Sequence, residues 1–252
     1  MTEDLNFEQL IIMVAVLPLI SALLIQLFSE RIGRGVARLS VAFTILSFIL
    51  SAILLTFALT SEGPMTLQIG NTTAIMLFDP LGTLLATIIL GISLIVHLYS
   101  VRYMAEEAAY GQFFVLLDLM TAALLFMVFA GDLITLVISW WLVGVLLYFL
   151  LGQDTRSQTA YRFAFWTLIT YRIGDLPLIL AAALLFNAYD TWSLTVIFNQ
   201  IMANPDAHQF LGFSLTNVVA ALVGLAAFAR SAQFLYILGY LIQWTDPLQY
   251  RH

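Results

Sequence analysis

Seven long apolar runs make up most of this 252-residue chain. Each is about as long as the roughly 20 residues that a helix needs to cross a bilayer, and the last is longer. No stretch alternates polar and apolar residues as a membrane β-strand does. The sequence therefore predicts an all-α polytopic membrane protein, a single transmembrane domain over 1–252 with about seven transmembrane helices. The runs lie at about 9–28, 38–60, 79–100, 112–130, 133–152, 163–186 and 213–243.

The composition excludes several classes of protein. Charged residues are 10% of the chain and hydrophobic ones 62%, whereas a soluble domain has about 25% charged residues. A soluble enzyme is thus excluded, and the net charge of -6 argues against a nucleic-acid partner. Without cysteine the chain has no disulfide and no thiolate site. No arrangement typical of a catalytic, cofactor or metal site is present, so we expect none in this chain.

Basic residues mark one side of the predicted membrane topology. All nine are arginines, and the expected loops after the first, third and fifth runs hold six of them, while the loops after the second, fourth and sixth hold none. The positive-inside rule then places the N-terminus outside the cytoplasm and the C-terminus inside it. The six are Arg31, Arg34, Arg38, Arg102, Arg156 and Arg162.

The segment 191–202 follows the sixth run and repeats its apolar residues with a helical period. That pattern is typical of a short helix lying along the membrane interface. An ordinary loop that carries a few apolar residues fits the same stretch. Both interpretations stay open at the level of sequence.

Five ionisable residues lie inside apolar runs, where a charge at the helix centre costs about 2.5 kcal/mol or more. They are therefore the candidates for an ion pathway. Arg172 and Asp175 are three residues apart on one helix and can pair, either to fix helix packing or to tune a nearby proton carrier. The five are His97, Asp118, Arg172, Asp175 and Arg230.

Each of the other three candidates has a structural and a functional interpretation. Asp118 is either a proton-relay acid or a neutral acid bonded to another helix. His97, near the end of its run, is either a hydrogen-bonded residue or a relay imidazole. Arg230 cannot release its proton, so it can hold an anion, pair with a carboxylate or set a positive potential.

Four motifs together resemble the antiporter-like membrane subunits: subunit L of complex I, the large Mrp antiporter subunit and the DabB-type subunit of inorganic carbon transporters. Their order and spacing agree over residues 79–234, and residues 235–252 form a divergent tail. The chain thus corresponds to about the first half of the usual subunit. The motifs are HLYSVRYM with YGQFF (97–104, 110–114), WWLVG with YFLLG (140–144, 148–152), YRIGD (171–175) and RSAQF (230–234).

Three departures from the family pattern concern its proton half-channel. The resemblance implies a Glu where this chain has Trp141, a Lys where it has Arg230, and a helix-breaking Pro where it has Leu235. We therefore expect a helix that continues from about 214 to 243. Asp118 takes a position that is usually neutral, and it is a hypothetical partial substitute for the lost Glu because their two helices adjoin.

The resemblance implies a membrane subunit of a proton- or sodium-gradient-coupled complex. A divergent subunit of an inorganic carbon uptake system, with a large zinc-containing carbonic-anhydrase-like partner, is one setting. A proton-translocating subunit of NADH-quinone oxidoreductase, beside other complex I subunits, is the second. A non-conducting scaffold is the third, because the titratable pair is absent. The expected location is the bacterial inner membrane.

Overall fold

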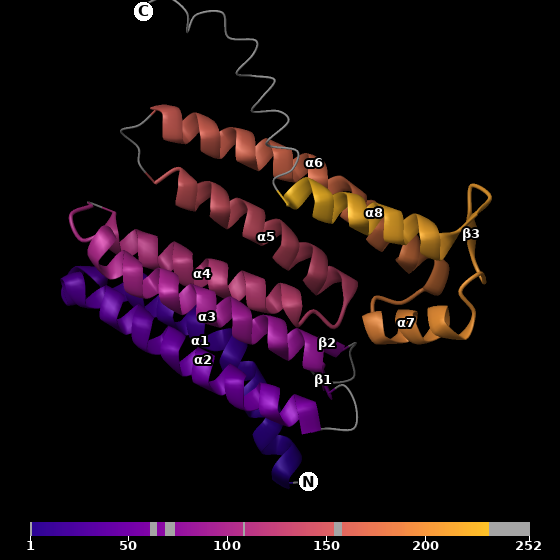
Figure 1. Cartoon of the computed structure of the whole chain (residues 1–252), viewed down its shortest axis with the longest axis horizontal. Coiled ribbons are helices and arrows are strands. Elements are labelled where there is room, and N and C mark those ends of the chain that lie inside the picture. The colour runs from indigo at the N-terminus through magenta and orange to yellow at the C-terminus, as the bar shows by residue number, and fades with distance from the viewer. Residues whose placement is uncertain (1, 61–64, 69–73, 108, 154–157, 232–252) are drawn as a thin grey trace, which may run out of the picture. The chain divides into compact units, whose positions relative to one another are not determined.

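The computed structural model describes residues 2–60, 65–68, 74–107, 109–153 and 158–231, which Figure 1 shows in colour. Within them, six helices are long and apolar enough to cross a membrane. This confirms the predicted all-α, multi-pass class. The six are α1 (Thr2–Ile32), α2 (Val36–Thr60), α3 (Pro80–Tyr103), α4 (Tyr110–Val128), α5 (Leu133–Leu151) and α6 (Gln158–Tyr189).

The seventh predicted span is shorter than expected in the described part of the chain. Helix α8 (Leu215–Arg230) ends at Arg230, so the prediction of a helix running on without a break was wrong at this point. The Ser231 hydroxyl donates to the Phe228 carbonyl oxygen at 2.8 Å, and the Ser231 N–H donates to the Ala227 carbonyl oxygen at 3.0 Å. These bonds satisfy carbonyls of the last turn without a following Pro. The rest of the predicted span, 232–243, lies outside the described residues.

The segment after α6 forms a short helix, α7 (Leu194–Ala203), as one of the two sequence interpretations proposed. Its start is tied to the loop before α5. The Leu194 N–H donates to the Gly131 carbonyl oxygen at 3.0 Å, and the Leu133 N–H donates to the Trp192 carbonyl oxygen at 2.9 Å. Its position at a membrane interface stays a prediction.

Two short hairpins were not predicted from the sequence. Strand β1 (Met65–Gln68) pairs antiparallel with β2 (Ala74–Phe78), and β3 (Gln209–Phe210) pairs with β4 (Phe213–Ser214). The first hairpin is joined to the end of α4, because the Leu77 N–H donates to the Phe129 carbonyl oxygen at 2.8 Å. It therefore covers one end of the helices around α4.

The chain divides into two compact units. The first comprises residues 1–153 with 192–195, and in it α1, α2, α3 and α4 pack side by side, with α5 against α4 (Figure 1). The second comprises 154–191 and 196–252, and its described part is built on the contact between α6 and α8. The single transmembrane domain over 1–252 stays a prediction.

Aspartates begin two helices of the first unit. The Asp79 carboxylate accepts from the Gly82 N–H at 2.7 Å, and Pro80 takes the first helical position of α3. The Asp132 carboxylate accepts from the N–H and the hydroxyl of Thr135 at 2.7 and 2.8 Å. Both are N-caps, which satisfy otherwise unpaired N–H groups at a helix start. These two acids therefore have structural tasks.

In the second unit, Gly174 allows α6 and α8 to approach closely. A Cβ atom added at Gly174 would lie 2.8 Å from the Ala229 Cβ, closer than two side chains tolerate. We expect Gly174→Ala to destabilise the second unit by about 1–3 kcal/mol, the usual cost of overpacking a close contact. A thermal unfolding series in detergent measures this change.

Gly224 on α8 is the matched control, since a Cβ there meets nothing within 4 Å. Gly224→Ala adds a better helix former and is expected to leave the unfolding temperature unchanged or raise it. A Gly174→Ala protein as stable as the Gly224→Ala protein would contradict this account of the α6–α8 contact.

Candidate functional site

A buried carboxylate lies at the centre of the first unit. Asp118 on α4 has no exposed surface, and its oxygens face three other helices. The Ser21 hydroxyl of α1 donates to Oδ2 at 2.6 Å, and the Ser40 hydroxyl of α2 lies 2.9 and 3.0 Å from Oδ1 and Oδ2. His97 Nε2 of α3 lies 3.1 Å from Oδ1. One carboxyl group therefore joins four helices.

The second nitrogen of His97 fixes how this pair is protonated. Nδ1 lies 2.7 Å from the Ser93 carbonyl oxygen, which only accepts hydrogen bonds, so Nδ1 carries a hydrogen. The contact between Nε2 and Asp118 then holds one proton, which belongs either to the imidazole or to the carboxyl. Both forms have the same net charge, and the transfer between them covers a single hydrogen bond.

This arrangement suits a group that takes up and releases a proton. Histidine is the side chain whose charge changes most readily near neutral pH. The Ser21 and Ser40 hydroxyls donate to the carboxylate and can also accept from the neutral acid, so they fit both forms of Asp118. The same contacts also hold α1–α4 together.

Asp118 does not face α5, the helix in which Trp141 takes the position of the family's Glu. The opposite side of α4, with Leu116 and Ala123, packs against Val143 and Leu146 of α5. Trp141 on α5 is 48% exposed, whereas Asp118 is fully buried. The two helices adjoin as expected, but the carboxylate points away from α5. Asp118 is thus a separate site, and its role as a partial substitute for the lost Glu stays a hypothesis.

A second ionisable cluster lies between α6 and α8 in the second unit. Asp175, which is buried, contacts Arg172 one turn away at 3.1 Å (Oδ2 to Nη2). Its other oxygen lies 3.9 Å from Nη2 of Arg230. The Arg230 guanidinium also lies over the Tyr171 ring, 5.2 Å from its centroid. One carboxylate therefore approaches two guanidinium groups at a helix contact.

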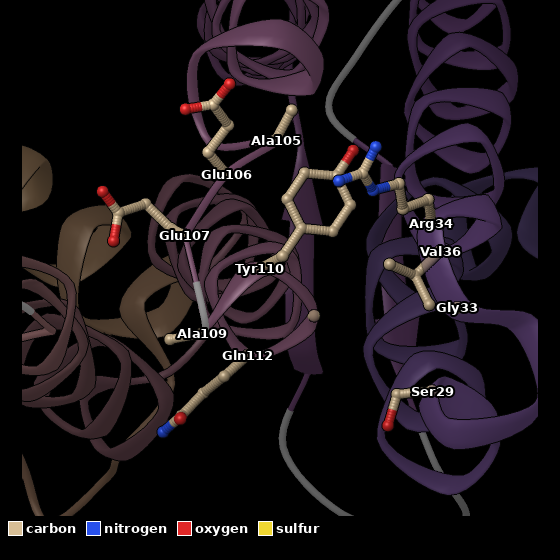
Figure 2. A pocket seen from close by; sticks show the side chains of 11 residues that line it. Ser29, Gly33, Arg34, Val36, Ala105, Glu106, Glu107, Ala109, Tyr110 and Gln112 are labelled. Atoms are coloured by element: carbon tan, nitrogen blue, oxygen red, sulfur yellow. The ribbon is translucent and has the colours of Figure 1, made fainter.

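A cavity of about 540 Å³ opens at one end of the first unit. Figure 2 shows Tyr110 extending towards Arg34, with Glu106 and Glu107 on the side away from that arginine. The cavity joins the connection between α1 and α2 to the connection between α3 and α4, so those two connections lie at the same end. It is lined by Ser29, Gly33, Arg34, Val36, Ala105, Glu106, Glu107, Ala109, Tyr110, Gly111 and Gln112.

The structure groups the five predicted residues into two sites. His97 and Asp118 meet in the first unit, and Arg172, Asp175 and Arg230 meet in the second. Among the described residues, no group of three or more His, Asp or Glu is placed to hold a metal ion. The hydroxyl partners Ser21 and Ser40 were not predicted, because serine is common in membrane helices.

Two family models match the chain. Residues 65–114 match the model described as NADH-ubiquinone oxidoreductase (complex I), chain 5 N-terminus. Residues 130–237 match the model described as NADH:quinone oxidoreductase/Mrp antiporter, TM. The chain is 49% identical over 223 residues to the probable inorganic carbon transporter subunit DabB1 of Halothiobacillus neapolitanus, which covers 88% of this chain and 40% of that relative.

More distant relatives belong to quinone oxidoreductases. The chloroplastic NAD(P)H-quinone oxidoreductase subunit 5 of Anthoceros angustus is 28% identical over 86% of this chain and 31% of its own length. The chain thus spans less than half the length of these curated relatives.

The fold is shared with two solved membrane complexes. A subunit of the Mrp complex from Dietzia sp. DQ12-45-1b matches with a TM-score of 0.69 and 24% identity, covering 88% of this chain and 23% of that one. A subunit of the archaeal membrane-bound sulfane sulfur reductase matches with a TM-score of 0.72 and 17% identity, covering 87% and 44%. Sequence motifs, family models and fold agree: the chain belongs to the antiporter-like family of membrane subunits of complex I, Mrp antiporters and inorganic carbon transporters.

Proposed function

We propose that this chain is a membrane subunit of an inorganic carbon uptake complex coupled to a proton or sodium gradient. The observation that carries the proposal is its 49% identity to a probable inorganic carbon transporter subunit. Identity to the quinone oxidoreductase subunit 5 of Anthoceros angustus is far lower, at 28%. The proposed partner is a large zinc-containing, carbonic-anhydrase-like subunit, and the proposed location is the bacterial inner membrane.

The His97–Asp118 pair supplies the coupling chemistry in this proposal. A proton that enters the first unit converts the pair to an imidazolium beside a neutral carboxyl group, and its release restores the starting pair. The positions that the resemblance assigns to the usual Glu and Lys hold Trp141 and Arg230, neither of which carries protons. The buried pair is therefore the proposed carrier among the described residues.

We propose that the cluster around Asp175 contributes to helix packing and to the local charge and does not transfer protons. The Asp175 carboxylate lies 3.1 Å from the Arg172 guanidinium and 3.9 Å from that of Arg230, and it links α6 to α8. We therefore assign Arg172, Asp175 and Arg230 a positioning role.

The test is to express the protein with an affinity tag, solubilise its membranes gently and identify co-purifying proteins by mass spectrometry. We expect a large soluble subunit with about one zinc ion per copy, and gradient-dependent accumulation of bicarbonate or CO2 in cells that express both. Loss of the proton or sodium gradient by an ionophore should abolish accumulation.

Two other outcomes correspond to the alternatives raised by the sequence. Recovery of quinone-reductase subunits would overturn the carbon-uptake proposal and place the chain in complex I. Recovery of the expected partner with no gradient dependence would assign the chain a scaffold role.

A further inference from the structure

One face of α2 carries a row of buried hydroxyl groups. Ser40, Thr44, Ser47 and Ser51 follow one another at intervals of four, three and four residues, which is the spacing of a single helix face. Each is at most 2% exposed. Small residues of this kind also let membrane helices pack closely, so the row by itself indicates only packing.

Three of the four hydroxyl groups in the row have a hydrogen-bond partner, and one has none among the described residues. Ser40 contacts Asp118, and Thr44 donates to the Ser40 carbonyl oxygen at 2.9 Å. Ser51 lies 2.8 Å from the Thr87 hydroxyl of α3. Ser47, between them, has no hydrogen-bond partner among the residues that the structure describes. A fully buried hydroxyl without a partner calls for an additional group beside it, and an internal water molecule is the usual one.

The row extends the Asp118 site along the helix axis. Ser40 and Ser51 are eleven residues apart, a rise of about 16 Å, which is about half of the hydrocarbon thickness of a bilayer. Measured from Asp118 along the helices, the cavity lies in the direction opposite to Ser51. Along α4, Tyr110 at the cavity is eight residues from Asp118, a rise of about 12 Å. The His97–Asp118 pair thus lies between an open cavity and the hydroxyl row.

We infer that water at Ser47 completes a proton path inside the first unit, from the His97–Asp118 pair along α2 to Ser51 and Thr87. Each hydroxyl or water accepts one proton and releases its own, so the number of protons in the row is unchanged after a transfer. The path avoids the positions of Trp141 and Arg230. This inference rests on the proposed function, in which the pair carries the coupling proton.

Hydration of the hydroxyl row on α2 can be measured without a transport assay. The sequence contains no cysteine, so Ser47→Cys introduces the only thiol of this chain. In membranes with the native complex, we expect a small water-soluble methanethiosulfonate to modify Cys at 47, detected by mass spectrometry of the chain. Leu54→Cys on the same helix is the control, because Leu54 is equally buried among apolar side chains and should stay unmodified.

Conduction is tested by two variants of equal shape. Ser47→Val removes the hydroxyl and should reduce proton flux at least tenfold, whereas Ser47→Thr adds nearly the same volume and should stay within about threefold of the parent protein. Thr56→Val removes an exposed α2 hydroxyl that donates to the Ile53 carbonyl oxygen, and it should leave proton flux unchanged. Membrane abundance is measured for each variant.

The outcomes separate this inference from the proposed function. Modification at Ser47 with a selective loss in Ser47→Val supports the path. No modification at Ser47, or equal flux in the Val and Thr variants, overturns it. If the parent complex transports nothing in response to a gradient, the proposed function is wrong, and the row does not conduct protons for it. The labelling result still shows whether water reaches the row of hydroxyl groups.

Discussion

Replacing Asp118 by Asn is expected to reduce gradient-driven transport at least a hundredfold. The amide has nearly the same shape as the carboxyl but cannot take up or release a proton, and its NH2 group no longer accepts from Ser21 or Ser40. The pair with His97 then loses the group that exchanges the shared proton. The measurement is gradient-dependent uptake by the complete complex in vesicles, normalised to its abundance.

Asp132→Asn is the control for that variant. Asp132 is also buried and carboxylate-bearing, but it caps α5, and Asn caps a helix about as well as Asp. We expect normal transport and normal abundance. If the Asp118→Asn complex transports at the parent rate, the His97–Asp118 pair is not the carrier, and the proposed coupling site is wrong.

Replacing Asp175 by Ala is expected to cause the largest loss of stability. It leaves Arg172 and Arg230 near one another at the α6–α8 contact without the carboxylate that both approach. Removing one partner of a buried ion pair costs about 3–5 kcal/mol, and the partial exposure of Arg172 favours the lower end. We expect a fall in unfolding temperature of roughly 5–10 °C, measured by thermal denaturation in detergent.

Asp190→Asn provides the comparison for Asp175→Ala. Asp190 follows α6, is exposed and has a φ of 49°, a backbone conformation that Asn adopts readily. Its replacement should leave the unfolding temperature unchanged. An Asp175→Ala protein with an unchanged unfolding temperature would show that the two arginines are compensated by other groups.

The long helices were predictable because length and hydropathy determine them. The run at 133–152 became α5 (Leu133–Leu151), and the run at 112–130 became α4 (Tyr110–Val128). The hairpin of β1 and β2 was missed, because its strands are only four and five residues long. Their pairing depends on the positions in space of the end of α2 and the start of α3. The local sequence pattern does not predict those positions.

The candidate sites were predictable in part. Arg172 and Asp175 share a helix face, so their pairing follows from a spacing of three residues. His97 and Asp118 lie on different helices, and only the packing of α3 against α4 brings them together. Ser40 was detectable in principle, because it begins the row of hydroxyls on α2 with helical spacing.

The partners of Asp118 have a consequence for how the protein is made. Ser21, Ser40 and His97 all precede Asp118 in the chain, so the ribosome delivers α1, α2 and α3 before α4 emerges. The acidic helix therefore meets its complete set of hydrogen-bonding groups at the moment of insertion, and the cost of bringing a carboxyl into lipid is offset at once. Asp175 differs, because Arg230 is synthesised 55 residues later. The hydrogen bonds around Asp118 can thus form before any residue that follows α4 is translated.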